Sequence, residues 1–182
     1  MISTTSVASL EIGEKAPEFE DLRAADGGSY GLSSFDDNPV LALVFIGNGC
    51  PTVRVYEERL KTLQSTYGER GLQVVAINSN NPHLSPPDVY SELVKRAEVG
   101  GYNFPYLKDE DGSVGRSVGA IATPHAFVFD AERRVRYRGR IDDSRDPANI
   151  TSTDLENAIS DLLDGKSVQV PETQPFGCAI VT

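Results

Sequence analysis

A short hydrophobic run that ends in glycines, a cysteine and a proline limits what this chain can fold into. The run covers residues 39–46 and has no polar alternation, which is typical of a strand covered on both faces of a sheet. Gly47-Asn48-Gly49-Cys50-Pro51 comes next, followed by an amphipathic stretch over residues 52–67. This order predicts a buried strand, a tight loop and a helix with Cys50 at its N-terminus. Pro51 suits the first helical turn, where its missing N–H costs no hydrogen bond.

Cys50 is the first candidate for chemistry. A thiol at a helix N-terminus lies close to unpaired backbone N–H groups and to the positive end of the helix dipole. Both stabilise the thiolate and so lower the pKa of the thiol, which is about 8.5 in a free cysteine. Since the thiolate is the reactive form, we expect Cys50 to act as a nucleophile.

Strands and helices alternate along the rest of the chain. The predicted elements are a second buried strand over 72–77, a helix from Ser85 to Gly100, a short strand over 104–107, a short helix over 114–118, hairpin strands over 125–130 and 135–141, and a last helix from Thr153. Ser85 is expected as an N-cap, and Thr153-Asp154-Leu155-Glu156 has the pattern of a capping box. The order predicts an α/β fold with a central mixed sheet flanked by helices, parallel in part and with an antiparallel edge.

Length and charge narrow the class of protein. The 182 residues suit one domain, and the formal net charge of −10 argues against nucleic acid and anionic membrane surfaces as partners. No apolar run has the length of a membrane span, and the first basic residue is Lys15, so we expect no secretory signal and a cytoplasmic location. We expect residues 1–12 to be a flexible N-terminus, residues 13–165 the domain, and residues 166–182 a C-terminal tail.

Several motifs together point to a known family. They are Gly13-Glu14-Lys15-Ala16-Pro17-Glu18-Phe19, Cys50-Pro51, Tyr56-Glu57-Glu58-Arg59-Leu60, Val75-Ala76-Ile77-Asn78-Ser79-Asn80, Asn103-Phe104-Pro105-Tyr106-Leu107, Thr123-Pro124-His125 and Pro175-Phe176-Gly177-Cys178. With these the chain resembles the thioredoxin-like superfamily, in the redoxin branch of alkyl hydroperoxide reductases and thiol-specific antioxidant proteins. The resemblance implies a thioredoxin-like fold and a thiol-based redox protein. Such a protein needs no cofactor or metal, but it needs an external thiol donor.

The loop before the helix departs from the usual pattern of these relatives. They carry Cys-x-x-Cys at this place, and here the first cysteine is replaced by Gly47, which leaves only Cys50. Dithiol exchange within the loop is therefore impossible. Gly49 and Pro51, together with Thr123 and Pro124, are the residues that the resemblance assigns to the substrate groove. Thr123-Pro124 resembles the cis-proline loop, which would offer a strand edge to an extended peptide.

The second cysteine leaves two interpretations open. Cys178 is either a free thiol on the tail without a role, or the tail folds back so that Cys178 meets Cys50 and the two form a reversible disulfide bond. In the second case one thiol attacks the substrate and the other resolves the product.

Two other functions are alternatives. A thiol peroxidase would oxidise Cys50 with peroxide and resolve it with Cys178. However, Leu43, Gly47 and Pro124 stand where peroxidase relatives carry proline, threonine and arginine, so Arg138 or Arg140 would have to replace the arginine. The other alternative is a binding module without catalysis. The expected partners are a protein or small-molecule disulfide or a peroxide, with the chain a monomer or a homodimer. His125 is a further candidate base near Cys50.

Overall fold

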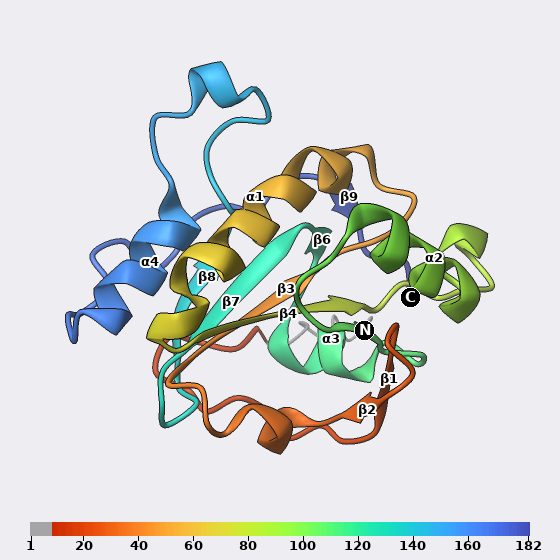
Figure 1. Ribbon diagram of the computed structural model, residues 1–182, viewed down its shortest axis with the longest axis horizontal. Helices are drawn as coiled ribbons and strands as arrows, with labels where there is room; N and C mark the ends of the chain where they lie inside the picture. The colour runs from red at the N-terminus through yellow and green to blue at the C-terminus, as the bar shows by residue number, and fades with distance from the viewer. Residues whose placement is uncertain (1–8) are drawn as a thin grey trace, which may run out of the picture.

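A seven-stranded mixed sheet forms the centre of the molecule. The computed structural model describes residues 9–182 (Figure 1). The strands of this sheet are β1 (Leu22–Ala24), β2 (Ser29–Tyr30), β3 (Val40–Phe45), β4 (Leu72–Asn78), β5 (Tyr106–Lys108), β7 (His125–Phe129) and β8 (Val135–Gly139). Their order is β2-β1-β5-β4-β3-β7-β8. The pairs β3–β4 and β4–β5 are parallel and the others are antiparallel, which confirms the predicted mixed sheet.

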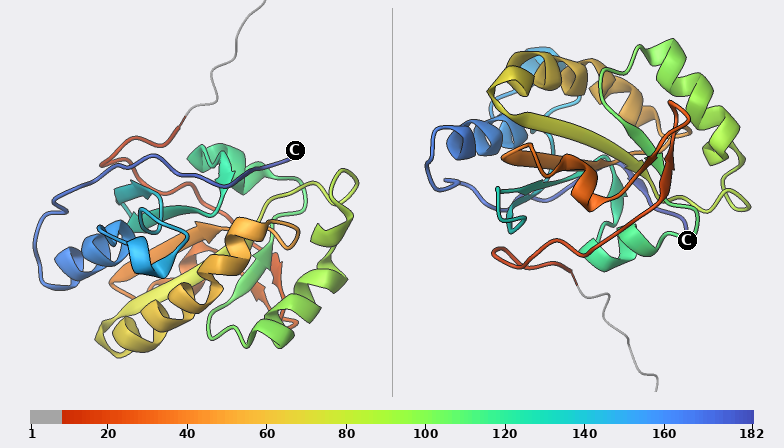
Figure 2. Two further views of the ribbon diagram at one scale, coloured as in Figure 1. Left: turned by 90° about the horizontal axis from the view of Figure 1, so that it is seen from above. Right: turned by 60° about the horizontal axis from the view of Figure 1, so that its bottom comes forward.

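Helices cover both faces of this sheet (Figure 2). They are α1 (Pro51–Tyr67), α2 (Tyr90–Gly100), α3 (Ser113–Val118) and α4 (Asp154–Leu163), with 3₁₀ turns η1 (Leu32–Phe35), η2 (Gly68–Arg70), η3 (Pro86–Asp88) and η4 (Pro147–Asn149). Side chains of α1, α2 and α4 pack on one face, and those of α3 and η1 on the other. Ala42 and Val44 of β3 face the first layer, whereas Leu43 and Phe45 face the second. The continuous hydrophobic run is therefore buried on both sides, as predicted.

Two predicted helix starts are wrong in detail. Ser85 stands at the N-cap of the separate turn η3 over residues 86–88 but makes no capping hydrogen bond, and α2 begins only at Tyr90 after an extended Val89. The Ser85 hydroxyl donates to the Asp88 carboxylate instead. At α4 the helix begins where expected, but Thr153 makes no capping hydrogen bond. Glu156, which would complete that box, accepts a hydrogen bond from Tyr67 of α1. At Ser85 a local contact with Asp88, and at Glu156 a contact with α1, has taken the side chain that the cap needs.

The C-terminal tail runs back over the sheet to the start of α1. It first lies along β8, where the backbone N–H of Thr173 donates to the carbonyl of Arg138. It then ends as β9 (Cys178–Ala179), which pairs antiparallel with β6 (Ala122–Thr123) in a second, two-stranded sheet. Figure 2 shows this segment crossing the molecule from α4 to the C-terminus. The tail therefore places Cys178 beside the predicted site.

Residues 1–8 of the expected flexible N-terminus lie outside the described residues. Leu10, which follows them, is buried, and its N–H donates to the carbonyl of Val118 at the end of α3. Among residues 9–182, none of the helices has both the length and the apolar character that a membrane span requires.

Candidate functional site

The two cysteines of the chain meet at the start of α1. Cys50 is the N-cap residue of α1, in extended conformation, and Cys178 is the first residue of β9. Their Sγ atoms lie 2.7 Å apart, and both thiols are free. A disulfide bond has an S–S length of about 2.05 Å, so a small movement of the side chains joins the two sulfurs. The structure agrees with the second interpretation of Cys178, in which the tail folds back so that Cys178 meets Cys50.

The two thiols differ in exposure and in acidity. Cys50 is only 4% exposed, whereas Cys178 is partly exposed. Burial opposes ionisation of Cys50, but hydrogen bonds from Cys178, Thr123 and backbone N–H groups outweigh it and lower the pKa of Cys50. Burial, together with the hydrogen bond to Cys50 and its charge, raises the pKa of Cys178 to about 11. Of the two thiols, Cys50 therefore ionises more readily than Cys178.

Thr123 and Pro124 lie next to this pair of cysteines. Both residues are buried, and the peptide bond between them is cis, as predicted. Thr123 pairs with Cys178 in the antiparallel register of β6 and β9. Its carbonyl accepts a hydrogen bond from the Cys50 thiol at 3.3 Å. Thr123 thus contacts both cysteines, and the strand edge predicted for an extended peptide is covered by the chain's own tail.

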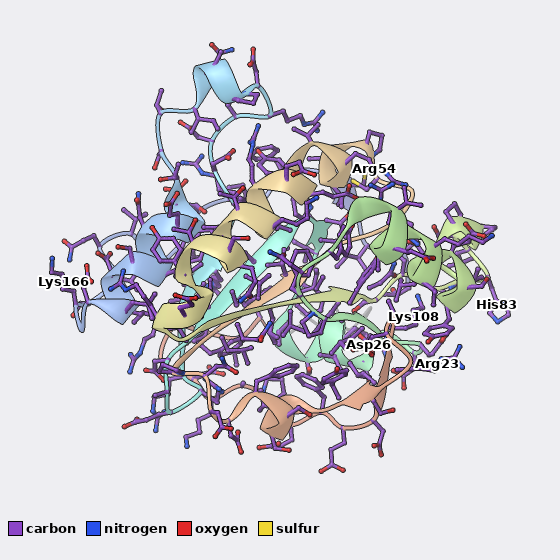
Figure 3. All side chains as sticks on the ribbon, viewed as in Figure 1. Arg23, Asp26, Arg54, His83, Lys108 and Lys166 are labelled. Atoms are coloured by element: carbon purple, nitrogen blue, oxygen red, sulfur yellow. The ribbon has the colours of Figure 1, made fainter. Side chains whose placement is uncertain are left out.

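The loop after β4 holds the end of the tail. The side-chain oxygen of Asn80 accepts from the N–H of Val181 at 2.9 Å, and the N–H of Asn81 donates to the carbonyl of Val181 at 2.8 Å. Lys108 is buried and donates to the carbonyl of Asn80 at 2.6 Å; its place beside α2 is marked in Figure 3. The main chain of the tail is therefore hydrogen bonded to β6 on one side and to the loop after β4 on the other.

Asp88 connects the loop before α1 with the loop after β4. This carboxylate is 1% exposed and accepts hydrogen bonds from the backbone N–H of Asn48 and from the side-chain amides of Asn78 and Asn80. Four donors, with the Ser85 hydroxyl, compensate its buried charge. Asp88 thus fixes both the loop that carries Cys50 and the loop that holds the tail.

The remaining residues of the loop before α1 lie at the rim of the site. Gly49 and Pro51 are exposed, so the structure brings them near Cys50 without burying them. Gly47 is buried, and a Cβ there would lie 2.7 Å from the Asn80 amide nitrogen and 3.8 Å from the Thr123 hydroxyl. Arg54, at the start of α1 in Figure 3, donates to the carbonyl of Asn48.

Three other candidates have roles away from the cysteines. His125 is buried and its Nδ1 accepts from the N–H of Ile121, and burial lowers its pKa to about 4, so it is a neutral structural residue. Arg138 pairs with Glu172 and Arg140 with Asp154, so both arginines are engaged in ion pairs elsewhere. Within residues 9–182 no three His, Cys, Asp or Glu side chains gather to hold a metal ion.

The sequence did not reveal three residues that complete the site. Phe176 packs its ring on Tyr56 of α1 at 6.2 Å, Gly177 lies against Thr123, and Asp88 joins the two loops. Gly177 stood inside a motif of the resemblance, and Asp88 was assigned to a helix start. Their roles depend on contacts between segments far apart in the chain, for which no local pattern exists.

Comparisons with known proteins identify the family and the fold of the chain. The model of the family described as Redoxin matches residues 11–159. A hypothetical protein of Sinorhizobium meliloti, SMc02350, has a crystal structure that superposes with a TM-score of 0.88 at 37% identity over 96% of this chain and 97% of its own. The thiol:disulfide interchange protein DsbE of Vibrio cholerae is 28% identical over 74% of this chain and 67% of its own length. The thiol-disulfide oxidoreductase ResA of Bacillus thuringiensis is 24% identical over 72% and 70%.

Proposed function

Because the chain belongs to the redoxin family, we propose that it is a thiol-disulfide oxidoreductase whose working pair is Cys50 and Cys178. The observation that carries this proposal is the distance of 2.7 Å between the two Sγ atoms, which come from opposite parts of the chain. The tail supplies the second thiol that the loop before α1 lacks at Gly47. The names of the relatives DsbE and ResA describe the same class of reaction.

The two cysteines divide the work according to exposure and pKa. In the disulfide form, the thiolate of an external donor attacks the partly exposed sulfur of Cys178. The Cys50–Cys178 bond breaks, a donor–Cys178 bond forms, and Cys50 leaves as a thiolate. A leaving thiol of low pKa departs faster, and the pKa of Cys50 is lowered. A second donor thiolate then attacks the donor sulfur, which gives a donor disulfide and reduced Cys178.

The dithiol form returns these two electrons to a small disulfide by the reverse steps. The Cys178 thiol passes its proton to the Cys50 thiolate 2.7 Å away, and its sulfur attacks the substrate disulfide to form the mixed disulfide. One substrate sulfur leaves as a thiolate and takes that proton from Cys50, and the Cys50 thiolate then attacks Cys178 to expel the other substrate sulfur. The buried Cys50 is therefore the resolving residue, and Cys178 is the residue that exchanges with the outside.

The test is whether the two cysteines form a reversible bond. The full chain is oxidised with glutathione disulfide, digested without reductant and searched by mass spectrometry for the linked peptides, with Cys178→Ser as the control. We expect a link that dithiothreitol removes, and wild-type but not Cys178→Ser protein to reduce glutathione disulfide through it. Two thiols that stay separate under oxidising conditions would falsify the proposal.

The setting of this activity is proposed on the sequence alone. We propose that the chain works in the cytoplasm, since two cysteines in 182 residues make no disulfide scaffold, and that it is a monomer or homodimer. Cell fractionation and sedimentation measure these two properties directly.

A further inference from the structure

A long loop between β8 and α4 packs against α1. It covers residues 142–153, includes η4 and projects from the molecule in Figure 1. The Arg59 guanidinium of α1 anchors this loop, because it donates to the Asp142 carboxylate and to the carbonyl of Arg145. The same guanidinium lies over the Tyr56 ring, 4.5 Å from its centroid. The loop is therefore fixed to α1 within one turn of Tyr56.

The end of the tail contacts the same face of α1, closer to the start of the helix. Phe176 packs its ring on the Tyr56 ring, and the backbone N–H of Thr52 donates to the sulfur of Cys178. Thr52 and Tyr56 are four residues apart, so they lie one above the other on one face of the helix. The loop packs on the next turn of that face. It therefore borders the surface on which the partly exposed sulfur of Cys178 lies.

Arg145 brings an unpaired positive charge to this border. Its side chain is exposed, and none of the ion pairs within residues 9–182 includes it. The three aspartates of the loop accept hydrogen bonds from other groups, which are Arg59 and Tyr56 for Asp142, Thr151 for Asp143 and Ala148 for Asp146. Burial raises the pKa of Cys178, and the charge of Arg145 acts against that increase. The guanidinium is thus near enough to act on a negative charge at this sulfur.

A local positive charge matters here because the protein is strongly acidic. With a formal net charge of −10, the molecule as a whole repels anions. At physiological ionic strength such a field is screened beyond about 8 Å, so the charges close to the sulfur decide which reagents gather there. A guanidinium can bind a carboxylate through two parallel hydrogen bonds. The surroundings of Cys178 therefore favour an anionic reagent, against the charge of the whole chain.

We propose that Arg145 is a specificity-determining residue that recruits small thiols and disulfides carrying a carboxylate to Cys178. The proposal rests on the proposed function and adds to it the chemical class of the small reactants. The carboxylate of the reactant pairs with Arg145 while its sulfur reaches Cys178. No bond changes at Arg145, and the exchange steps are those given above. Arg145 is a positioning residue, which raises the rate with anionic reactants relative to the rate with neutral ones.

The preference for anions is tested in the full-length Cys50→Ser protein, where Cys178 is the only cysteine left. Two disulfide probes are compared, the dianion 5,5′-dithiobis(2-nitrobenzoate) and the neutral 2,2′-dithiodipyridine. With each probe the Cys178 thiolate attacks one sulfur, a mixed disulfide forms, and the other sulfur leaves with the electron pair of the broken bond. The absorbance of the released half measures the rate. The readout is the ratio of the two rate constants, because a change in the pKa of Cys178 alters both through the same thiolate fraction.

We expect Arg145→Gln to lower this ratio about threefold to fivefold, which is the range of an exposed ion pair. The substitution leaves the backbone carbonyl that Arg59 binds, so the loop keeps its anchor. Arg145→Lys keeps the charge and should restore most of the ratio. Added salt should lower the ratio of the unsubstituted Cys50→Ser protein towards that of Arg145→Gln, because salt screens the pair.

Lys166→Gln is the matched control. It removes the same charge from an exposed position after α4, at the left edge of the molecule in Figure 3, and should leave the ratio unchanged. A ratio that Arg145→Gln leaves as it is, or that Lys166→Gln lowers by the same factor, overturns the proposal.

The outcomes distinguish this proposal from the proposed function, because the test needs no bond between Cys50 and Cys178. If the wild-type chain forms that bond and the ratio does not depend on Arg145, only the recruitment of anions is overturned. If the ratio depends on Arg145 and no bond forms in the wild type, only the disulfide pair is overturned.

Discussion

Thr123 acts on both cysteines from a single position. Its hydroxyl is one of the hydrogen-bonding groups that lower the pKa of Cys50, and its backbone pairs with Cys178. Thr123→Val keeps the shape of the side chain and the backbone pairing but removes the hydroxyl. We therefore expect the pKa of Cys50 to rise and its alkylation by iodoacetamide at neutral pH to slow severalfold.

The rate is followed for the Cys50 peptide by mass spectrometry across a range of pH. Thr62→Val, on the exposed side of α1, is a control that should leave the rate unchanged. If the pH midpoint of the alkylation rate is the same in Thr123→Val as in the wild type, the other hydrogen-bond donors alone lower the pKa of Cys50.

His125 makes the stability of the chain depend on pH. Burial lowers the pKa of His125 from 6.5 to about 4, so the unfolded chain binds this proton more readily than the folded chain does. The contribution of neutral His125 to the free energy of unfolding is complete above pH 6.5 and is lost as the pH falls to about 4. The shift corresponds to about 3 kcal/mol in the free energy of unfolding.

Urea unfolding at a series of pH values measures this loss. His125→Asn keeps a hydrogen-bond acceptor for the N–H of Ile121 but does not titrate, so we expect a flatter profile between pH 6.5 and 4. The other histidine, His83, is exposed, and Figure 3 shows it at the edge of the molecule. His83→Asn should keep the wild-type slope. The same loss of stability in both variants and in the wild type would argue against the role of His125.

At the scale of elements, η3 holds together two loops that come from different strands. Asp88→Asn replaces one acceptor oxygen of Asp88 by an NH₂ group, which faces either the two donors of Asn48 and Asn78 or the two donors of Asn80 and Ser85. Leaving buried donors unpaired costs about 1–3 kcal/mol each, so we expect a loss of about 3 kcal/mol in the free energy of unfolding. Denaturant titration measures it. Ser85→Ala removes only one donor and should lower the free energy of unfolding clearly less. An equal loss in the two variants would mean that the Asp88 carboxylate stabilises the two loops no more than its single hydrogen bond with Ser85 does.

The tail depends on a second contact between elements, the packing of Phe176 on Tyr56. Phe176→Ala removes this ring contact while leaving Cys178 in the chain. An aromatic pair with its buried area is worth about 1 kcal/mol or more, so we expect the equilibrium constant for closing the Cys50–Cys178 bond to fall about tenfold. Redox titration against glutathione measures this constant. Val170→Ala, an exposed position earlier in the tail, should not change it.

Sequence patterns predicted the elements better than their ends and their long-range contacts. The run over residues 39–46 is continuously apolar and the stretch over 52–67 has helical periodicity, and both formed as predicted. Ser85 and Thr153 have the residues of helix caps, but Asp88 and Tyr67 compete for the side chains that those caps need. The contact of Cys178 with Cys50 came only as one of two alternatives. It is decided by the pairing of β9 with β6, two-residue strands without a sequence signal of their own.

At the scale of the whole molecule, the proposed bond between Cys50 and Cys178 would join residues 128 apart in the chain. A crosslink over so long a loop restricts the unfolded chain and adds up to about 5 kcal/mol to the free energy of unfolding. The bond fixes the tail that already lies along β8 and β6, so it needs little rearrangement of the folded chain. We therefore expect the oxidised protein to unfold at a clearly higher urea concentration than the reduced protein.

Cys178→Ser separates this effect from other consequences of oxidation. Its unfolding midpoint should be the same with and without oxidant and close to that of the reduced wild type. Since a strained bond stabilises less than a relaxed one, the difference between the oxidised and reduced wild type also measures how well the reduced fold is prepared for closure. A urea midpoint that falls on oxidation would mean that the bond pulls the tail away from β6. The positions of the two thiols in the reduced protein would then differ from those in the disulfide form.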